Sequence, residues 1–309
     1  MIIHIGFPRC ASTTLQYLFD KSDVNFLGCN PKAKLNKFYH SSIGSFFEST
    51  LRFGTDKHFD DNCESVKEFL LKESKLNNIK TILSYENICF RLTPWDLPTD
   101  IKIKRLGLIT PKDSTILVSF RNPKNFLISL FKNHVSFGYT ETFNIFIKEL
   151  FILKDFGWFL DLKLDYLTAL LLKHTNASNI IFLNIDVSAN IKKLLEKLSI
   201  NTRIDNIPFS NKSINLVENE SARLFNKNKV NSRYLLDWLE IHRTFPNSNL
   251  PNDFIFDISR NRIKQSEYIS MDNNNHNYLL NDFEWPDIVE DLSNSNQIFL
   301  DSTVNKKII

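Results

Sequence analysis

The sequence predicts an α/β protein with a central parallel sheet, helices on both faces of the sheet and helical additions towards the C-terminus. Short β-branched runs alternate with amphipathic segments over the first two thirds of the 309 residues, an alternation typical of parallel strands joined by right-handed crossovers. The strands are continuous apolar runs, as expected where both faces of a sheet are covered. We therefore expect one domain over 1–309, with its core in 1–210 and a mostly helical part in 211–309.

Five apolar runs are the expected strands, and amphipathic segments separate them. The strands are "MIIHIGF" at 1–7, "VNFLG" at 24–28, "IKTILSYEN" at 79–87, "STILVSF" at 114–120 and "NIIFLNI" at 179–185. The expected helices are 12–22, 64–76, 121–135, 164–174 and 190–200, followed by 221–228 and 233–243. Ser12 or Thr13 is expected to cap the first helix, and Pro123 suits the first turn of the third.

Composition excludes several classes of protein. The net charge of +3 does not indicate a general nucleic-acid binder, although a mildly basic chain can hold an anion in a basic pocket. The four cysteines lie far apart, without metal-ligand spacing, which indicates reduced thiols. No window reaches the roughly 18 apolar residues of a membrane helix, and no positive region precedes the first apolar run. We expect a cytoplasmic protein without a membrane segment.

The segment "IGFPRCASTTLQ" has the composition of an anion site. A strand, a loop that begins at Gly6 and a helix start direct backbone N–H groups into one concavity, where the helix dipole adds partial positive charge. Small residues let a ligand approach the backbone, Arg9 adds a fixed charge, and hydroxyl groups can donate hydrogen bonds. The residues concerned are Arg9, Cys10, Ala11, Ser12, Thr13 and Thr14. The alternative is a tight strand–helix turn that binds nothing. A Walker A loop is excluded because its lysine is missing.

The segment "ILVSFRNPKNFLISLF" supplies a second candidate site. Arg121 follows a strand, and Ser129 lies eight residues later on the same side of the following helix. Ligands of open α/β sheets bind outside the carboxyl ends of the strands, and an Arg fork with a hydroxyl suits a phosphate. If each residue is considered separately, there are simpler alternatives. Arg121 would form a surface salt bridge, and Ser129 would be an ordinary hydroxyl residue of a helix.

Together these two segments resemble the cofactor-binding motifs of sulfotransferases that use 3′-phosphoadenosine-5′-phosphosulfate (PAPS), with some similarity to bacterial carbohydrate sulfotransferases. The resemblance implies a P-loop-like fold, with the first motif, usually P-K-[ST]-G-T-T, around the 5′-phosphosulfate. Arg9 stands where the family usually has Lys, and Ala11 where it usually has Gly. Arg121 and Ser129 match the family's 3′-phosphate ligands in type and spacing.

Glu86 is the candidate general base. It lies just past the buried part of the expected third strand. The resemblance implies a catalytic Glu after that strand in glycan sulfotransferases, where the small-molecule branch uses a His. Its alternative is a solvated turn cap. His4 and His134 are weaker candidates, because His4 alternates within the first strand and His134 ends a helix. Arg9 is expected to stabilise the leaving phosphate, and no metal is required.

These features predict transfer of a sulfuryl group from PAPS to a hydroxyl of a carbohydrate or glycoconjugate, with 3′-phosphoadenosine-5′-phosphate (PAP) as the other product. The alternatives are a non-catalytic relative that binds PAP or another nucleotide, and a nucleotide-dependent kinase. The sequence does not name the acceptor, the position sulfated or the oligomeric state.

Overall fold

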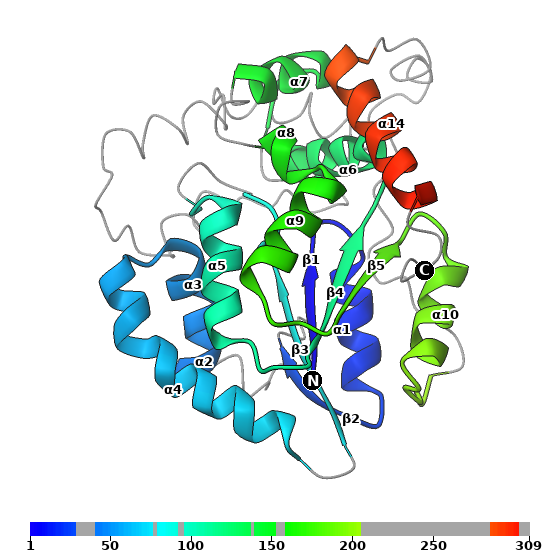
Figure 1. The fold of residues 1–309 in the computed structure, drawn as a ribbon. Coiled ribbons are helices and arrows are strands. Elements are labelled where there is room, and N and C mark those ends of the chain that lie inside the picture. Colours follow the sequence, from blue (N-terminus) through cyan, green and yellow to red (C-terminus); the bar gives the residue numbers. More distant parts are fainter. Residues whose placement is uncertain are drawn as a thin grey trace. The chain divides into compact units, whose positions relative to one another are not determined.

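Five parallel strands form one sheet. The computed structural model describes residues 1–28, 41–76, 79–91, 96–136, 139–152, 158–204 and 285–302. The strands are β1 (Ile2–Gly6), β2 (Val24–Gly28), β3 (Lys80–Glu86), β4 (Thr115–Phe120) and β5 (Asn179–Asn184). They lie in the order β2-β3-β1-β4-β5, and every pair is parallel (Figure 1). The predicted α/β class with a parallel sheet is therefore confirmed.

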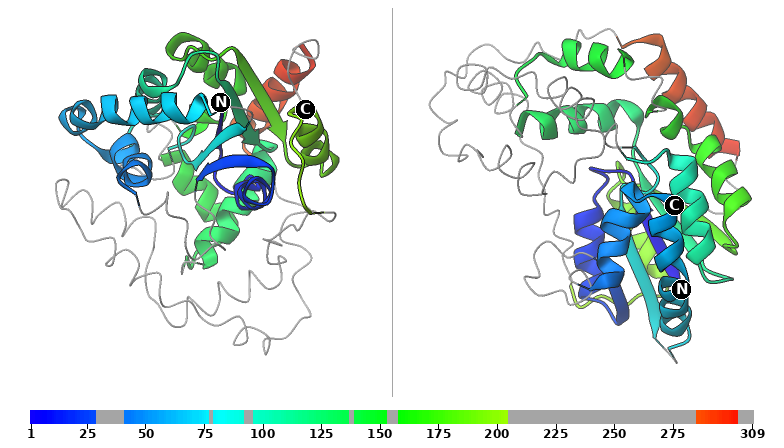
Figure 2. Two further views of the ribbon diagram at one scale, coloured as in Figure 1. Left: turned by 90° about the horizontal axis from the view of Figure 1, so that it is seen from below. Right: turned by 90° about the vertical axis from the view of Figure 1, so that its left-hand side faces the viewer.

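Helices cover both faces of this sheet. Helices α1 (Ser12–Asp20) and α10 (Ala189–Lys197) pack on one face in a shared apolar cluster with alternate strand residues. Helices α4 (Asp56–Ser74), α5 (Thr99–Ile109) and α9 (Leu164–His174) lie on the other face (Figure 2). Apolar side chains thus cover both faces of the sheet, as the continuous apolar runs of the strands predict.

The chain divides into two compact units. The first comprises Met1–Pro123, Phe156–Asn211 and Glu290–Ile309, and the second comprises Lys124–Asp155 and Lys212–Val289. The first unit contains the sheet and the helices named above, together with α2 (Ser42–Ser45), the π-helix η1 (Phe46–Thr50), α3 (Leu51–Phe53), α8 (Trp158–Asp161) and most of α14 (Asp287–Ser302). The expected single-domain organisation stays a prediction.

The second unit has an aromatic core of its own. It contains helix α7 (Phe143–Ile152) and helix α6 (Pro123–Ser136), except for Pro123 itself. One face of α6 is buried: Phe126, Leu127, Leu130 and Phe131. The ring of Phe131 packs edge-on against those of Tyr139 and Phe143. Phe131 and Tyr139 are therefore core residues of this unit.

The predicted elements agree with the structure at most positions. All five strands, and the helices expected at 12–22, 121–135, 164–174 and 190–200, are present and begin and end within three residues of their expected bounds. Helix α4 begins at Asp56, eight residues before the expected 64. The predicted helices at 221–228 and 233–243 lie outside the described residues. None of the described helices is both long enough and apolar enough to cross a membrane.

Candidate functional site

The carboxyl ends of β1, β3 and β4 bring three of the predicted site segments together. In the sheet, Gly6 lies opposite Glu86 on one side and Ser119 on the other. Beyond the strands, the amide of Phe7 donates to the carbonyl of Ser119 at 3.0 Å, and that of Asn87 donates to the carbonyl of Gly6 at 3.4 Å. Glu86 and the loop after β1 therefore occupy one sheet edge with the end of β4.

The loop between β1 and α1 contains two residues in left-handed conformations. Arg9 has φ 63° and Ala11 has φ 55°, values that favour glycine. Ala11 is the N-cap of α1, and no side chain caps this helix, so the prediction that Ser12 or Thr13 caps it is wrong. Left-handed residues in such a loop turn successive N–H groups to one side, which is how anion-binding concavities form.

A glycine is required at position 6 because side chains surround its α-carbon. A Cβ there would collide with Ser119 Oγ and lie 2.9 Å from Ser12 Oγ. Among the described residues, Ser12 Oγ and Arg9 Nε have no hydrogen-bond partner although both atoms are buried. Buried polar groups are rarely left unpaired. These two groups therefore suit a polar ligand held against the start of α1.

Two guanidinium groups and a carboxylate influence one another at this edge. Burial lowers the pKa of Arg9, the negative charge of Glu86 raises it, and the positive charge of Arg121 lowers it again. Arginine remains charged in proteins despite such shifts. The fully buried thiol of Cys10 has its pKa raised well above the ordinary value, mainly by burial. Cys10 therefore contributes its backbone and its small volume to the loop, and its thiol stays neutral.

Arg121 is paired with a carboxylate that the sequence did not reveal. Its Nε and Nη2 donate to Asp186 Oδ1 at 3.1 and 2.9 Å, and the amide of Asn122 donates to Asp186 Oδ2 at 2.8 Å. Asp186 lies in the turn after β5, where its own amide donates to the side chain of Asn184. Two of the guanidinium's five donors serve this pair, so three N–H groups face other directions.

Ser129 belongs to the second unit, whereas Arg121 belongs to the first. Ser129 is buried on α6, and His134 is buried near the end of the same helix. Burial lowers the pKa of His134 to about 4. Since the two residues belong to different units, the pairing of Ser129 with Arg121 at one phosphate stays a prediction.

A row of polar side chains lies beneath the loop, on the α1 face of the sheet. The ring of His4 is fully buried and hydrogen-bonds through Nδ1 to Ser84 Oγ at 2.7 Å and through Nε2 to Ser119 Oγ at 3.0 Å. Burial lowers the pKa of His4 to about 3. His4 is therefore a neutral member of the core at physiological pH, as its alternating position in β1 indicated.

The buried His4 should make the protein less stable as the pH falls. The unfolded chain protonates His4 near pH 6.5, but the folded chain does so only near pH 3, so stability should fall across this interval and be constant above it. The slope for one histidine approaches about 1.4 kcal/mol per pH unit. Urea unfolding between pH 7 and pH 4 should show a shallower slope for His4→Asn than for the wild type. The exposed His58→Asn variant should keep the wild-type slope, and an unchanged slope in His4→Asn would refute this assignment.

The left-handed conformation of Ala11 predicts a stabilising substitution. Glycine adopts φ near 55° without the steric cost that alanine incurs, about 1–2 kcal/mol, partly offset by its greater freedom in the unfolded chain. We expect Ala11→Gly to raise the free energy of unfolding by about 0.5–1 kcal/mol in urea titrations. Ala169→Gly, within helix α9, should destabilise by a similar amount. A loss of stability in Ala11→Gly would show that the loop holds no such strain.

In the described part of the chain, no three His, Cys, Asp or Glu side chains are grouped so as to hold a metal ion. Cys10, Cys63 and Cys89 are free thiols, and Cys29 lies outside the described residues. The chain matches no family model, and searches of curated proteins and of solved structures returned no match.

Proposed function

We propose that this protein transfers a sulfuryl group from PAPS to a hydroxyl group of a carbohydrate or glycoconjugate, on a P-loop-like fold. The main support for the proposal is that Arg9, Glu86 and Arg121 lie at the same sheet edge, around Gly6. Anion-binding donors and a carboxylate are thereby combined at one edge of the sheet. This is the arrangement needed to hold a phosphosulfate and deprotonate an attacking hydroxyl.

The buried donors of the first loop fit a phosphosulfate. Arg9 Nε and Ser12 Oγ are buried and, among the described residues, have no partner, and α1 has no side-chain cap. The first N–H groups of a helix have no acceptor within it. A sulfate or phosphate oxygen would accept from these groups and lie at the positive end of the helix dipole.

In the proposed reaction, the acceptor oxygen attacks the sulfur of PAPS in line with the bond to the bridging phosphate oxygen. The new O–S bond forms as the old S–O bond breaks, and its electron pair leaves with PAP. The hydroxyl proton passes to the carboxylate of Glu86, and the positive charge of Arg9 offsets the charge that grows on the phosphate. Atoms and charge therefore balance without a metal or a redox partner.

Arg121 has the capacity to bind the 3′-phosphate while it remains paired with Asp186. The pair uses Nε and one donor of Nη2, which leaves the Nη1 side of the guanidinium for a phosphate fork. Asp186 also limits rotation of the guanidinium, because the amide of Asn122 holds its second oxygen. A fixed Arg loses less conformational freedom on binding.

Thermal unfolding in the presence of PAP, ATP with Mg²⁺ or ADP tests the proposal against its alternatives, because a ligand of the folded state raises its stability. Of these three ligands, only PAP should raise the melting temperature. A screen of glycans with radiolabelled PAPS should yield a labelled product. Stabilisation by ATP with Mg²⁺ and none by PAP would favour a kinase. Stabilisation by PAP without transfer to any acceptor would favour a non-catalytic binding protein.

A further inference from the structure

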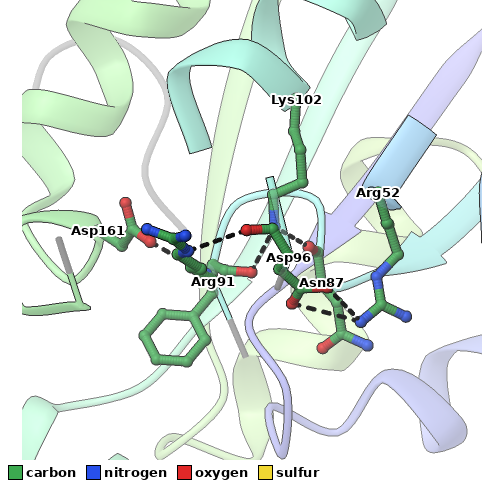
Figure 3. Close-up of polar contacts among 7 residues, drawn as sticks. Arg52, Asn87, Arg91, Asp96, Lys102 and Asp161 are labelled. Atoms are coloured by element: carbon green, nitrogen blue, oxygen red, sulfur yellow. Dashed lines mark hydrogen bonds and ion pairs between the residues drawn. The ribbon is translucent and has the colours of Figure 1, made fainter. Parts of the chain in front are cut away.

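A fully buried lysine lies beneath the turn that follows Glu86. Lys102 of helix α5 is 0% exposed, and its Nζ donates to the carbonyls of Asn87 at 2.6 Å and Phe90 at 2.7 Å (Figure 3). Lysine is almost never fully buried unless its charge is compensated. The proposed reaction gives Lys102 no part in catalysis, so its burial needs another explanation.

The surroundings keep this lysine charged. Burial lowers the pKa of Lys102 to about 8, while the carboxylates of Asp96 and Asp161 act to raise it and the guanidinium of Arg52 to lower it. Arg52 Nη2 donates to Asp96 Oδ1 at 3.0 Å, beside the lysine (Figure 3). At neutral pH the ammonium is therefore protonated and donates to both carbonyls.

The turn held by Lys102 fixes the chain directly after Glu86. Asn87 has φ 66°, so the backbone changes direction at this residue. Its amide donates to the carbonyl of Gly6, and its carbonyl accepts from Lys102. At the other end of the turn, the amide of Arg91 donates to Asp161 Oδ2 at 2.9 Å. Glu86 is thus followed by a residue that is hydrogen-bonded to the last residue of β1 and to helix α5.

We propose that Lys102 is a positioning residue that locks the Asn87–Phe90 turn and thereby sets the carboxylate of Glu86 at the sheet edge. The inference rests on the proposed function for the role of Glu86 but not for the locking of the turn. Without the ammonium, the carbonyls of Asn87 and Phe90 would lose the donor that joins them, and the turn would rearrange. A displacement of about 1 Å in a reacting group is sufficient to cost about 10²-fold in rate.

Lys102→Met tests this role, because it keeps the length of the side chain and removes its donors. Hydrogen exchange of the amides of residues 87–91 should become at least about tenfold faster. The turnover number should fall by about tenfold or more, while the dissociation constant of PAP stays within about twofold. The matched control is Lys104→Met, which removes an exposed lysine of the same helix and should change none of these quantities.

The same substitution in a Glu86→Gln background separates positioning from general stability. If Lys102 acts through Glu86, Lys102→Met should lower the turnover number little further once the carboxylate is gone. An equal fold-loss in both backgrounds, or unchanged exchange of residues 87–91, would overturn the proposal. If Lys102→Met does not fold, Lys102→Gln, which keeps N–H donors without charge, is measured in the same way with a smaller expected effect and the same two contradicting outcomes.

The exchange measurement also separates this inference from the proposed function. Faster exchange of residues 87–91 in a protein that transfers no sulfuryl group would disprove the proposed reaction and leave the lock on the turn established. Unchanged exchange in a protein that does transfer the group would disprove the role of Lys102 and leave the proposed reaction unaffected.

Discussion

Replacing Glu86 by Gln should lower the rate of sulfuryl transfer by about 10²–10⁴-fold, the usual effect of removing a positioned general base. Gln keeps the shape of the side chain but cannot take the acceptor's proton. Glu86 lies opposite Gly6 in the sheet, on the edge where the first loop would hold the sulfuryl group. PAP affinity should change little, because in the proposed reaction the carboxylate contacts the acceptor and not the nucleotide.

The measurement is the initial rate with radiolabelled PAPS and an acceptor found by the glycan screen, followed as a function of pH. The wild-type rate should fall in acid as Glu86 becomes protonated, and this decrease should be missing in the variant. Glu68→Gln, an exposed substitution on α4, is the matched control. Near-normal turnover in Glu86→Gln would return Glu86 to the role of a turn residue. His4 would not replace it, since both of its ring nitrogens are bonded to serines.

Replacing Arg9 by Met should lower the turnover number by about 10²–10³-fold and weaken PAP binding far less. Charge on the leaving phosphate grows towards the transition state, so a fixed positive charge beside it contributes most there. Arg9 is partly buried beside Glu86 and Arg121, where water screens its charge less than at the surface. Arg9→Lys should keep substantial activity, because it restores the charge and the residue that sulfotransferases usually have at this position.

Calorimetry with PAP and single-turnover rates separate the two effects of the Arg9 substitution. Arg203→Met, at an exposed ion pair with Asp23, is the control for the loss of a positive charge. Wild-type turnover in Arg9→Met would show that the guanidinium supports the structure of the loop and has no catalytic role. Equal losses in PAP affinity and turnover would assign it to ground-state binding.

The sequence predicted the sheet well, because each strand is a short, mainly apolar run between helical segments. It predicted Arg9, Glu86 and Arg121 at one edge, since the carboxyl ends of parallel strands meet there. The cap of α1 was predicted wrongly: hydroxyl residues usually cap helices, but here the left-handed backbone of Ala11 occupies the N-cap and leaves Ser12 inside the helix.

Two polar residues near the site had no recognisable pattern in the sequence. Asp186 contacts Arg121 across 65 positions of the chain, and such a pairing depends on strand order alone. Lys102 belongs to helix α5, whose segment "TDIKIKRLGLI" contains four charged residues among eleven, so a buried lysine there was not predicted. A lysine in the middle of an amphipathic segment is ordinarily exposed, and only the fold shows that its ammonium meets two carbonyls.

The proposed function requires the site to recognise a nucleotide with a 3′-phosphate. Calorimetric titration of the wild type and of Arg121→Ala with PAP and with 5′-AMP tests it most directly. The wild type should bind PAP more tightly than 5′-AMP by about 2–3 kcal/mol, or roughly 30- to 150-fold, and Arg121→Ala should lose most of that difference. Equal affinity of the wild type for PAP and 5′-AMP would disprove a 3′-phosphate site at Arg121.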